Sequence, residues 1–267
     1  MVSQLSITFM TISLIITFGL PVVLFLVWRK KYKLKLFPMF AGMAMYIMCV
    51  MIMQPIMHYI MLNPHADGTV RLFASDPALY VIYGAITAGI FEESGRFVAF
   101  HLLKKKYEGK ETALSYGIGY GAIEAILLAG ITLITTLTMS AMINDNEARL
   151  ALVAADDANL LYLINELIIT EPAYFLTPGI ERIITLSAHI SLSIIVWCSV
   201  KIKGKLWLYP AAIAMHAIFN ITPIMFQVGL IPNIWIVETT IFIFATLIAA
   251  AAFFACKIII KEDTETL

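Results

Sequence analysis

Long, predominantly apolar stretches decide what this chain can fold into. Seven stretches of more than twenty residues lie at 5–28, 37–62, 78–103, 112–142, 180–200, 206–227 and 234–256. An α-helix rises 1.5 Å per residue, so about twenty residues cross the roughly 30 Å hydrocarbon core of a bilayer. Only 13% of the 267 residues are charged, against about 25% in soluble domains. We therefore exclude a soluble globular domain and expect an all-α, polytopic bundle of about seven transmembrane spans.

The Lys and Arg residues are unevenly distributed around these stretches. Fourteen of the eighteen follow alternate stretches, which places them on one side of the membrane: Arg29, Lys30, Lys31, Lys33, Lys35, Lys104, Lys105, Lys106, Lys110, Lys201, Lys203, Lys205, Lys257 and Lys261. The opposite loops hold only Arg71 and Arg149. The positive-inside rule then predicts an external N-terminus and a cytoplasmic tail at 257–267. Because topology explains the basic clusters and the net charge is zero, no nucleic-acid partner is expected.

The connection at 143–179 is much longer than the others. Within it, residues 159–169 carry apolar side chains at helical spacing, which predicts an external helix or lid at the membrane surface. The sequence contains no internal repeat, so we expect a single integral membrane domain over 1–267 with a motif-bearing core at 78–227.

Ionisable residues inside membrane spans are costly and are therefore candidates for a functional site. The polar candidates in spans three to six are Glu92, Glu93, Arg96, Glu124, Arg182, His189, His216 and Asn220. Counted from the basic residue that bounds each span, Glu93, Glu124, His189 and His216 lie about 16 to 21 Å inside the membrane at 1.5 Å per residue. Four helices thus contribute acid or imidazole groups to one layer near the middle of the bilayer.

Helical spacing predicts that these groups share an inward face. Glu92 precedes Arg96 by four residues, and His216 precedes Asn220 by four. Gly117 and Gly121 form a GxxxG pattern, so we expect the fourth span to approach a neighbour closely. Arg96 is most simply a charge-neutralising partner of the glutamate pair. Arg182 lies near the outer end of its span, where we expect it to extend toward the headgroups.

This residue set permits more than one chemistry. Carboxylate, imidazole and amide groups in a protected layer can activate water and stabilise the oxyanion of a tetrahedral intermediate, as peptide hydrolysis requires. Glu93, His189 and His216 also offer three ligands, the number in an open catalytic zinc site. The alternatives without hydrolysis are a non-catalytic membrane chaperone, immunity or scaffold protein that keeps the cluster for packing, and a proton-coupled transporter.

The order of these motifs resembles a known group. Glu92-Glu93 with a following Arg96, then His189, then His216-x-x-x-Asn220, is similar to the glutamate-type intramembrane proteases of the CPBP/CAAX superfamily. The Glu-Glu-Ser-Gly-Arg form and Glu124 in its Gly-rich span most resemble the YhfC branch. The resemblance covers residues 91–220, about half the chain.

The resemblance implies a role for each matching residue. The first glutamate and first histidine, Glu92 and His189, would activate water without a cofactor, and His216 and Asn220 would form the oxyanion hole. Two residues rather than three separate the glutamate pair from the arginine here, so Glu92 and Glu93 both remain candidates for the base, with Zn²⁺ as the alternative. The resemblance also implies a membrane-embedded or membrane-adjacent peptide substrate and a bacterial plasma membrane.

Overall fold

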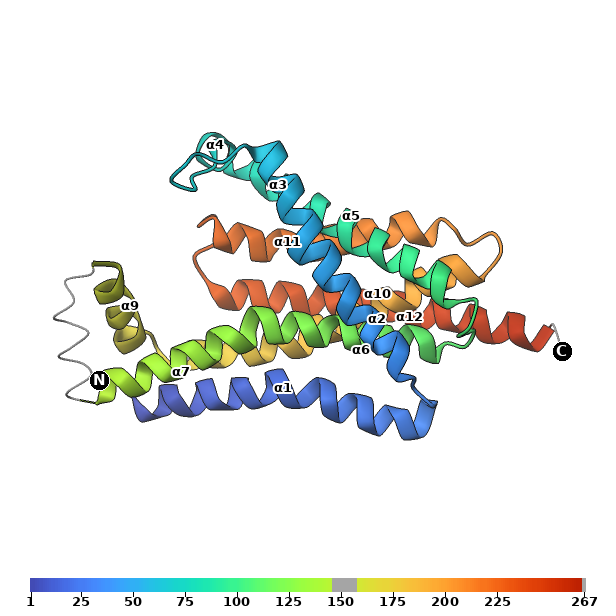
Figure 1. Cartoon of the computed structure of the whole chain (residues 1–267), viewed down its shortest axis with the longest axis horizontal. Helices are drawn as coiled ribbons and strands as arrows, with labels where there is room; N and C mark the ends of the chain where they lie inside the picture. Colours follow the sequence, from blue (N-terminus) through green and yellow to red (C-terminus); the bar gives the residue numbers. More distant parts are fainter. Residues whose placement is uncertain (146–157, 266–267) are drawn as a thin grey trace. The chain divides into compact units, whose positions relative to one another are not determined.

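The computed structural model describes residues 1–145 and 158–265 of the chain, and all regular elements in these ranges are helices (Figure 1). They are α1 (Gln4–Tyr32), α2 (Leu36–Tyr46), η1 (Ile47–Met53), α3 (Gln54–Leu62), α4 (Arg71–Ser75), α5 (Pro77–Leu103), α6 (Glu111–Glu124), η2 (Ala125–Gly130), α7 (Ile131–Asn144), α9 (Ala158–Ile169), η3 (Pro172–Leu176), α10 (Thr177–Lys201), α11 (Leu208–Gln227) and α12 (Ile234–Glu265). The predicted all-α class is confirmed.

Within the described ranges, six helical segments are long and apolar enough to cross a membrane: Gln4–Tyr32, Leu36–Leu62, Glu111–Asn144, Pro172–Lys201, Leu208–Gln227 and Ile234–Lys257. Helix α5 corresponds to the remaining predicted span and has 27 residues, but it carries Glu92, Glu93 and Arg96. The chain is therefore a polytopic helical membrane protein, while the count of seven spans and the orientation stay predictions. Helix α12 continues to Glu265, beyond the predicted end of its span at 256.

The chain divides into two compact units, of which the first comprises Met1–Val22 and Glu124–Ile183. Its apolar core contains Val2, Met10, Ala129, Leu133, Ile143 and Ile164. Helix α9 packs on α7 and contributes Ile164 to this core, which confirms the helix predicted at 159–169. Residues 146–157 of the predicted external loop lie outside the described residues.

The second unit comprises Val23–Ile123 and Ile184–Leu267. Helices α5 and α11 lie side by side in it (Figure 1). Gly89 of α5 makes this approach possible, because a Cβ there would lie 2.6 Å from the carbonyl oxygen of Ile213. Asp76 fixes the start of α5, since its carboxylate accepts a hydrogen bond from the backbone N–H of Leu79 at 3.0 Å.

Helices α6 and α10 are also in close contact within the second unit. A Cβ on Gly117 would lie 2.7 Å from Cα of Ile190, and a Cβ on Gly121 would lie 2.7 Å from Cδ1 of Leu186. Both distances are shorter than ordinary van der Waals contact. At Gly117 the nearest atom belongs to the backbone, so this position requires glycine at the observed separation. The close approach predicted from the GxxxG pattern is confirmed, and it brings α10, which carries His189, against α6.

Candidate functional site

A buried ion pair lies at the centre of the candidate site in the second unit. Nη1 of Arg96 donates to both carboxylate oxygens of Glu93, one turn earlier on α5. Both residues are 0% exposed. Two charges removed from water need this pairing, because an isolated charge in a low-dielectric interior is strongly destabilising. Arg96 therefore has the charge-neutralising role that the sequence predicted for it.

Glu93 also orients His216 of α11. Nδ1 of His216 lies 2.6 Å from Oε1 of Glu93, and because an ionised carboxylate only accepts hydrogen bonds, Nδ1 is the donor. The other ring nitrogen, Nε2, lies 3.6 Å from Oε1 of Glu92. The two neighbouring glutamates thus contact the two nitrogens of one imidazole, and Glu93 fixes the ring that Glu92 faces.

His189 of α10 joins the cluster from the opposite side of Arg96. Its Nδ1 lies 3.2 Å from Nη2 of Arg96. A guanidinium has donors only, so Nδ1 accepts and a neutral His189 carries its proton on Nε2. The imidazole centroid lies 5.7 Å from that of His216 and 5.1 Å from the ring of Tyr120. The sequence prediction that His189 and His216 lie near the glutamate pair agrees with this geometry.

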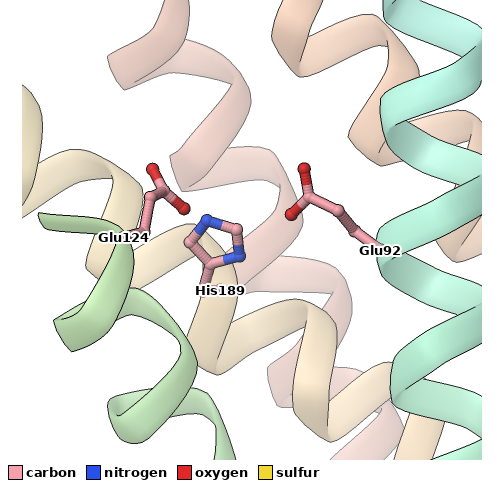
Figure 2. A group of neighbouring side chains, drawn as sticks. All are labelled: Glu92, Glu124 and His189. Atoms are coloured by element: carbon pink, nitrogen blue, oxygen red, sulfur yellow. The ribbon is translucent and has the colours of Figure 1, made fainter. Parts of the chain in front are cut away.

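Figure 2 shows the carboxylate of Glu92 and the imidazole of His189, both in the second unit, pointing toward one another. Glu124 is the last residue of α6 and belongs to the first unit. Glu92 and His189 each offer one ligand atom, and these two atoms lie within 4.8 Å of each other. This pair differs from the zinc set Glu93, His189 and His216 considered from the sequence.

Arg182 does not extend toward the headgroups as the sequence analysis expected. It is 5% exposed, its Nη1 donates to Oε1 of Glu124 at 3.0 Å, and its Nη2 pairs with Glu181. All three residues belong to the first unit. The expectation was wrong because it assumed that a residue near the end of a span reaches water. Arg182 instead binds a buried carboxylate that lies 58 residues earlier in the chain.

Two further residues complete the description of the site. Asn220 lies one turn after His216 on α11 and is half-buried, and none of the contacts described above involves it. Tyr120 was not singled out from the sequence, although its ring is 0% exposed and lies 4.9 Å from Cζ of Arg96. Its spacing of four residues before Glu124 on α6 is the signal that places both on one helix face.

Fold and site together define an integral membrane protein in which carboxylates, imidazoles and a guanidinium form one buried polar cluster between helices. The chain belongs to the YhfC family, because the family model described as "YhfC intramembrane metalloprotease" matches residues 16–241. A relative in Bacillus subtilis (strain 168), the "Uncharacterized membrane protein YhfC", is 31% identical over 248 residues, which are 92% of this chain and 95% of the relative. No solved structure matches the chain.

Proposed function

We propose that this protein is a metal-dependent intramembrane endopeptidase that hydrolyses a peptide bond in a membrane-embedded or membrane-adjacent substrate. The observation that carries the proposal is the meeting of Glu92 and His189 beside the Glu93–His216 pair, in a cluster of buried side chains. The family description of an intramembrane metalloprotease supports the same activity.

The donor chemistry of the cluster fits a zinc ion. Glu92 and His189 would be ligands, since carboxylate oxygen and imidazole nitrogen are ordinary zinc donors and two protein ligands leave positions for water. Glu92, Glu93 and Arg96 carry a formal charge of minus one together, which a cation would balance. A bound zinc ion would supply Lewis acidity and an activated water. Glu93 suits this role less well, because its oxygens already bind Arg96 and His216.

Metal binding at His189 requires a change in its hydrogen bonding. Nδ1 accepts from Arg96, so it becomes a ligand only when this hydrogen bond is broken. Nε2 becomes a ligand only when the ring proton moves to Nδ1, which then faces the Arg96 donor. In either case Arg96 must turn away from His189, so Arg96 and the metal compete for this ring.

The remaining residues supply positioning and proton transfer. Glu93 holds His216 by its Nδ1 proton, which presents Nε2 beside Glu92. At that position Nε2 can hold a proton and pass it to the amine that leaves when the peptide bond breaks. The amide of Asn220, on the same face of α11, would donate to the oxyanion together with His216. Without a metal, Glu92 would act as the general base, which is the glutamate-type alternative.

Metal content and cleavage can be measured separately on the same variants. The purified chain is analysed for bound zinc by mass spectrometry, and membranes that contain it are analysed for new protein N-termini. Glu92→Gln and His189→Ala are compared with Glu108→Gln and His65→Ala, which make the same chemical changes at exposed positions outside the cluster.

We expect the parent and both control variants to hold zinc and to generate the same new N-termini, and the two cluster variants to lose both properties. Cleavage that depends on Glu92 in protein without any metal would replace the metal-dependent mechanism by the glutamate-type one. New N-termini that persist in Glu92→Gln and His189→Ala would contradict the protease proposal and favour a scaffold role for the cluster.

A further inference from the structure

Three buried hydrogen-bond donors beside the cluster have no protein partner. They are the hydroxyl groups of Tyr116 and Tyr120 and Nε of Arg96, and all three residues are 0% exposed. A buried donor without a partner is destabilising, because it has lost its hydrogen bond to water. Folded proteins rarely leave several such groups together, and ordered water is the usual partner where protein groups are absent.

The three donors are close to one another within the second unit. Cζ of Arg96 lies 4.9 Å from the centre of the Tyr120 ring. The ring centroids of Tyr116 and Tyr120 are 6.0 Å apart and the ring planes are inclined by 26°, so the two phenol rings stack one helical turn apart on one face of α6. The other nitrogens of Arg96 contact Glu93 and His189, which connects this group of donors directly to the cluster.

The direction of α6 indicates where such water would enter. Side chains on a helix lean toward its N-terminus, so the phenol of Tyr120 leans toward the turn that contains Tyr116. Tyr116 in turn leans toward the first turn of α6, which begins at Glu111. The loop before Glu111 contains Lys104, Lys105, Lys106 and Lys110, and the positive-inside rule places it in the cytoplasm.

We propose that Tyr116, Tyr120 and Nε of Arg96 bind a buried file of water molecules that leads from the cytoplasmic end of α6 to the carboxylate cluster. Each phenol can donate to one water and accept from another, whereas Nε of Arg96 only donates. The use of this water as the reactant rests on the proposed hydrolase function. The existence of the water file does not rest on that function, so the water file and its use in hydrolysis can be refuted separately.

Hydroxyl-radical footprinting in lipid nanodiscs tests the water file directly. A short X-ray pulse produces radicals from bound water, and these oxidise aromatic side chains beside it. We expect oxidation of Tyr116 and Tyr120 despite their burial, and none of Trp197, which is 1% exposed and serves as the buried aromatic control. Tyr116 and Tyr120 that are oxidised no more than Trp197 would overturn the proposal.

Removal of the hydroxyl groups gives a second test that does not depend on activity. If water binds them, Tyr116→Phe and Tyr120→Phe break hydrogen bonds and lower the apparent melting temperature. Tyr209→Phe is the reference for this effect, because the Tyr209 hydroxyl is paired with Ser94 Oγ at 2.7 Å. If no water is present, both substitutions remove an unsatisfied group and raise the melting temperature, which would contradict the proposal.

The role in hydrolysis is then measured with any substrate identified by its new N-terminus. We expect Tyr120→Phe to lower kcat with KM unchanged, since the variant keeps the ring and loses one water contact. Unchanged kcat together with oxidised tyrosines would overturn the supply of reactant water while the water file itself stands. A parent protein without any cleavage activity would refute the proposed function, and the footprint would still decide whether the water is bound.

Discussion

The contact of α6 with α10 gives the sharpest test of how packing positions the cluster. In Gly117→Ala, the new methyl group would lie 2.7 Å from Cα of Ile190, 2.9 Å from Oγ of Ser193 and 3.1 Å from the carbonyl oxygen of His189. Two of these atoms are backbone atoms of α10, and they cannot turn away as a side chain can. Restoring ordinary contact, at about 3.5 to 4.0 Å between carbon atoms, requires α10 to move by about 1 Å.

This displacement has two expected consequences. Overpacking costs about 1 to 3 kcal/mol, and alanine recovers about 1 kcal/mol of helix propensity, so the free energy of unfolding should fall by at most about 2 kcal/mol. His189 is on the helix that moves, and a misplacement of about 1 Å can lower an enzymatic rate by about a hundredfold. Gly117→Ala should therefore lower activity far more than its loss of stability explains.

Two matched glycine substitutions on membrane helices separate these effects. Gly19→Ala on α1 places its methyl group where no atom lies within 4 Å, so we expect a small gain in stability and unchanged activity. In Gly121→Ala, the methyl group would first meet Cδ1 of Leu186, which can move, and the nearest backbone atom is 3.3 Å away. Its stability and activity should therefore lie between those of the other two variants. Thermal unfolding in detergent and cleavage rate in vesicles are measured for all three. A Gly117→Ala protein as stable and active as Gly19→Ala would refute the argument.

Three further predictions concern buried charges and topology. Glu93→Gln leaves Arg96 without its ion-pair partner, and should lower the free energy of unfolding by about 3 to 5 kcal/mol; thermal unfolding checks this, and adding Arg96→Met should restore part of the loss. Arg182→Ala should destabilise the chain by a similar amount because it leaves Glu124 without a cation, and a double variant with Glu124→Gln that is no more stable than Arg182→Ala would contradict this explanation. Asp67→Cys, in an otherwise cysteine-free chain, should react with a membrane-impermeant maleimide in intact cells, and labelling only after permeabilisation would reverse the predicted orientation.

The fold was predictable because one physical requirement dominates it. Backbone groups in hydrocarbon must be paired internally, so an apolar stretch of sufficient length has to form a helix. The predicted stretch at 112–142 and the observed segment Glu111–Asn144 differ by only one or two residues at each end. The interior of this segment was less predictable: η2 is π-helical from Ala125, directly after Glu124, and no composition rule marks such a turn.

The site prediction lacked the contacts between residues that are far apart in the sequence. Helical spacing places Glu92 and Arg96 on one face of α5, and this information is local. The hydrogen bond between His216 and Glu93 spans 123 residues, and the ion pair between Arg182 and Glu124 spans 58. Depth within the span was enough to place His216 in the layer of the glutamates, but it could not reveal that Arg182 pairs with the carboxylate of Glu124. The wider superfamily resemblance stays a prediction, since the family comparison supports the YhfC family alone.

The division of labour between the two adjacent glutamates follows from what each carboxylate already contacts. Successive residues on a helix point about 100° apart, so Glu92 and Glu93 cannot face the same partners. Glu93 is enclosed by Arg96 and His216, and a carboxylate held by two donors is a poor proton acceptor and has little room for a metal. Glu92 faces Nε2 of His216 and the ring of His189, the two imidazoles of the cluster. On the proposed function, the adjacent pair therefore divides into a structural carboxylate, Glu93, and a reactive one, Glu92, whereas the sequence alone left both as candidates for the base.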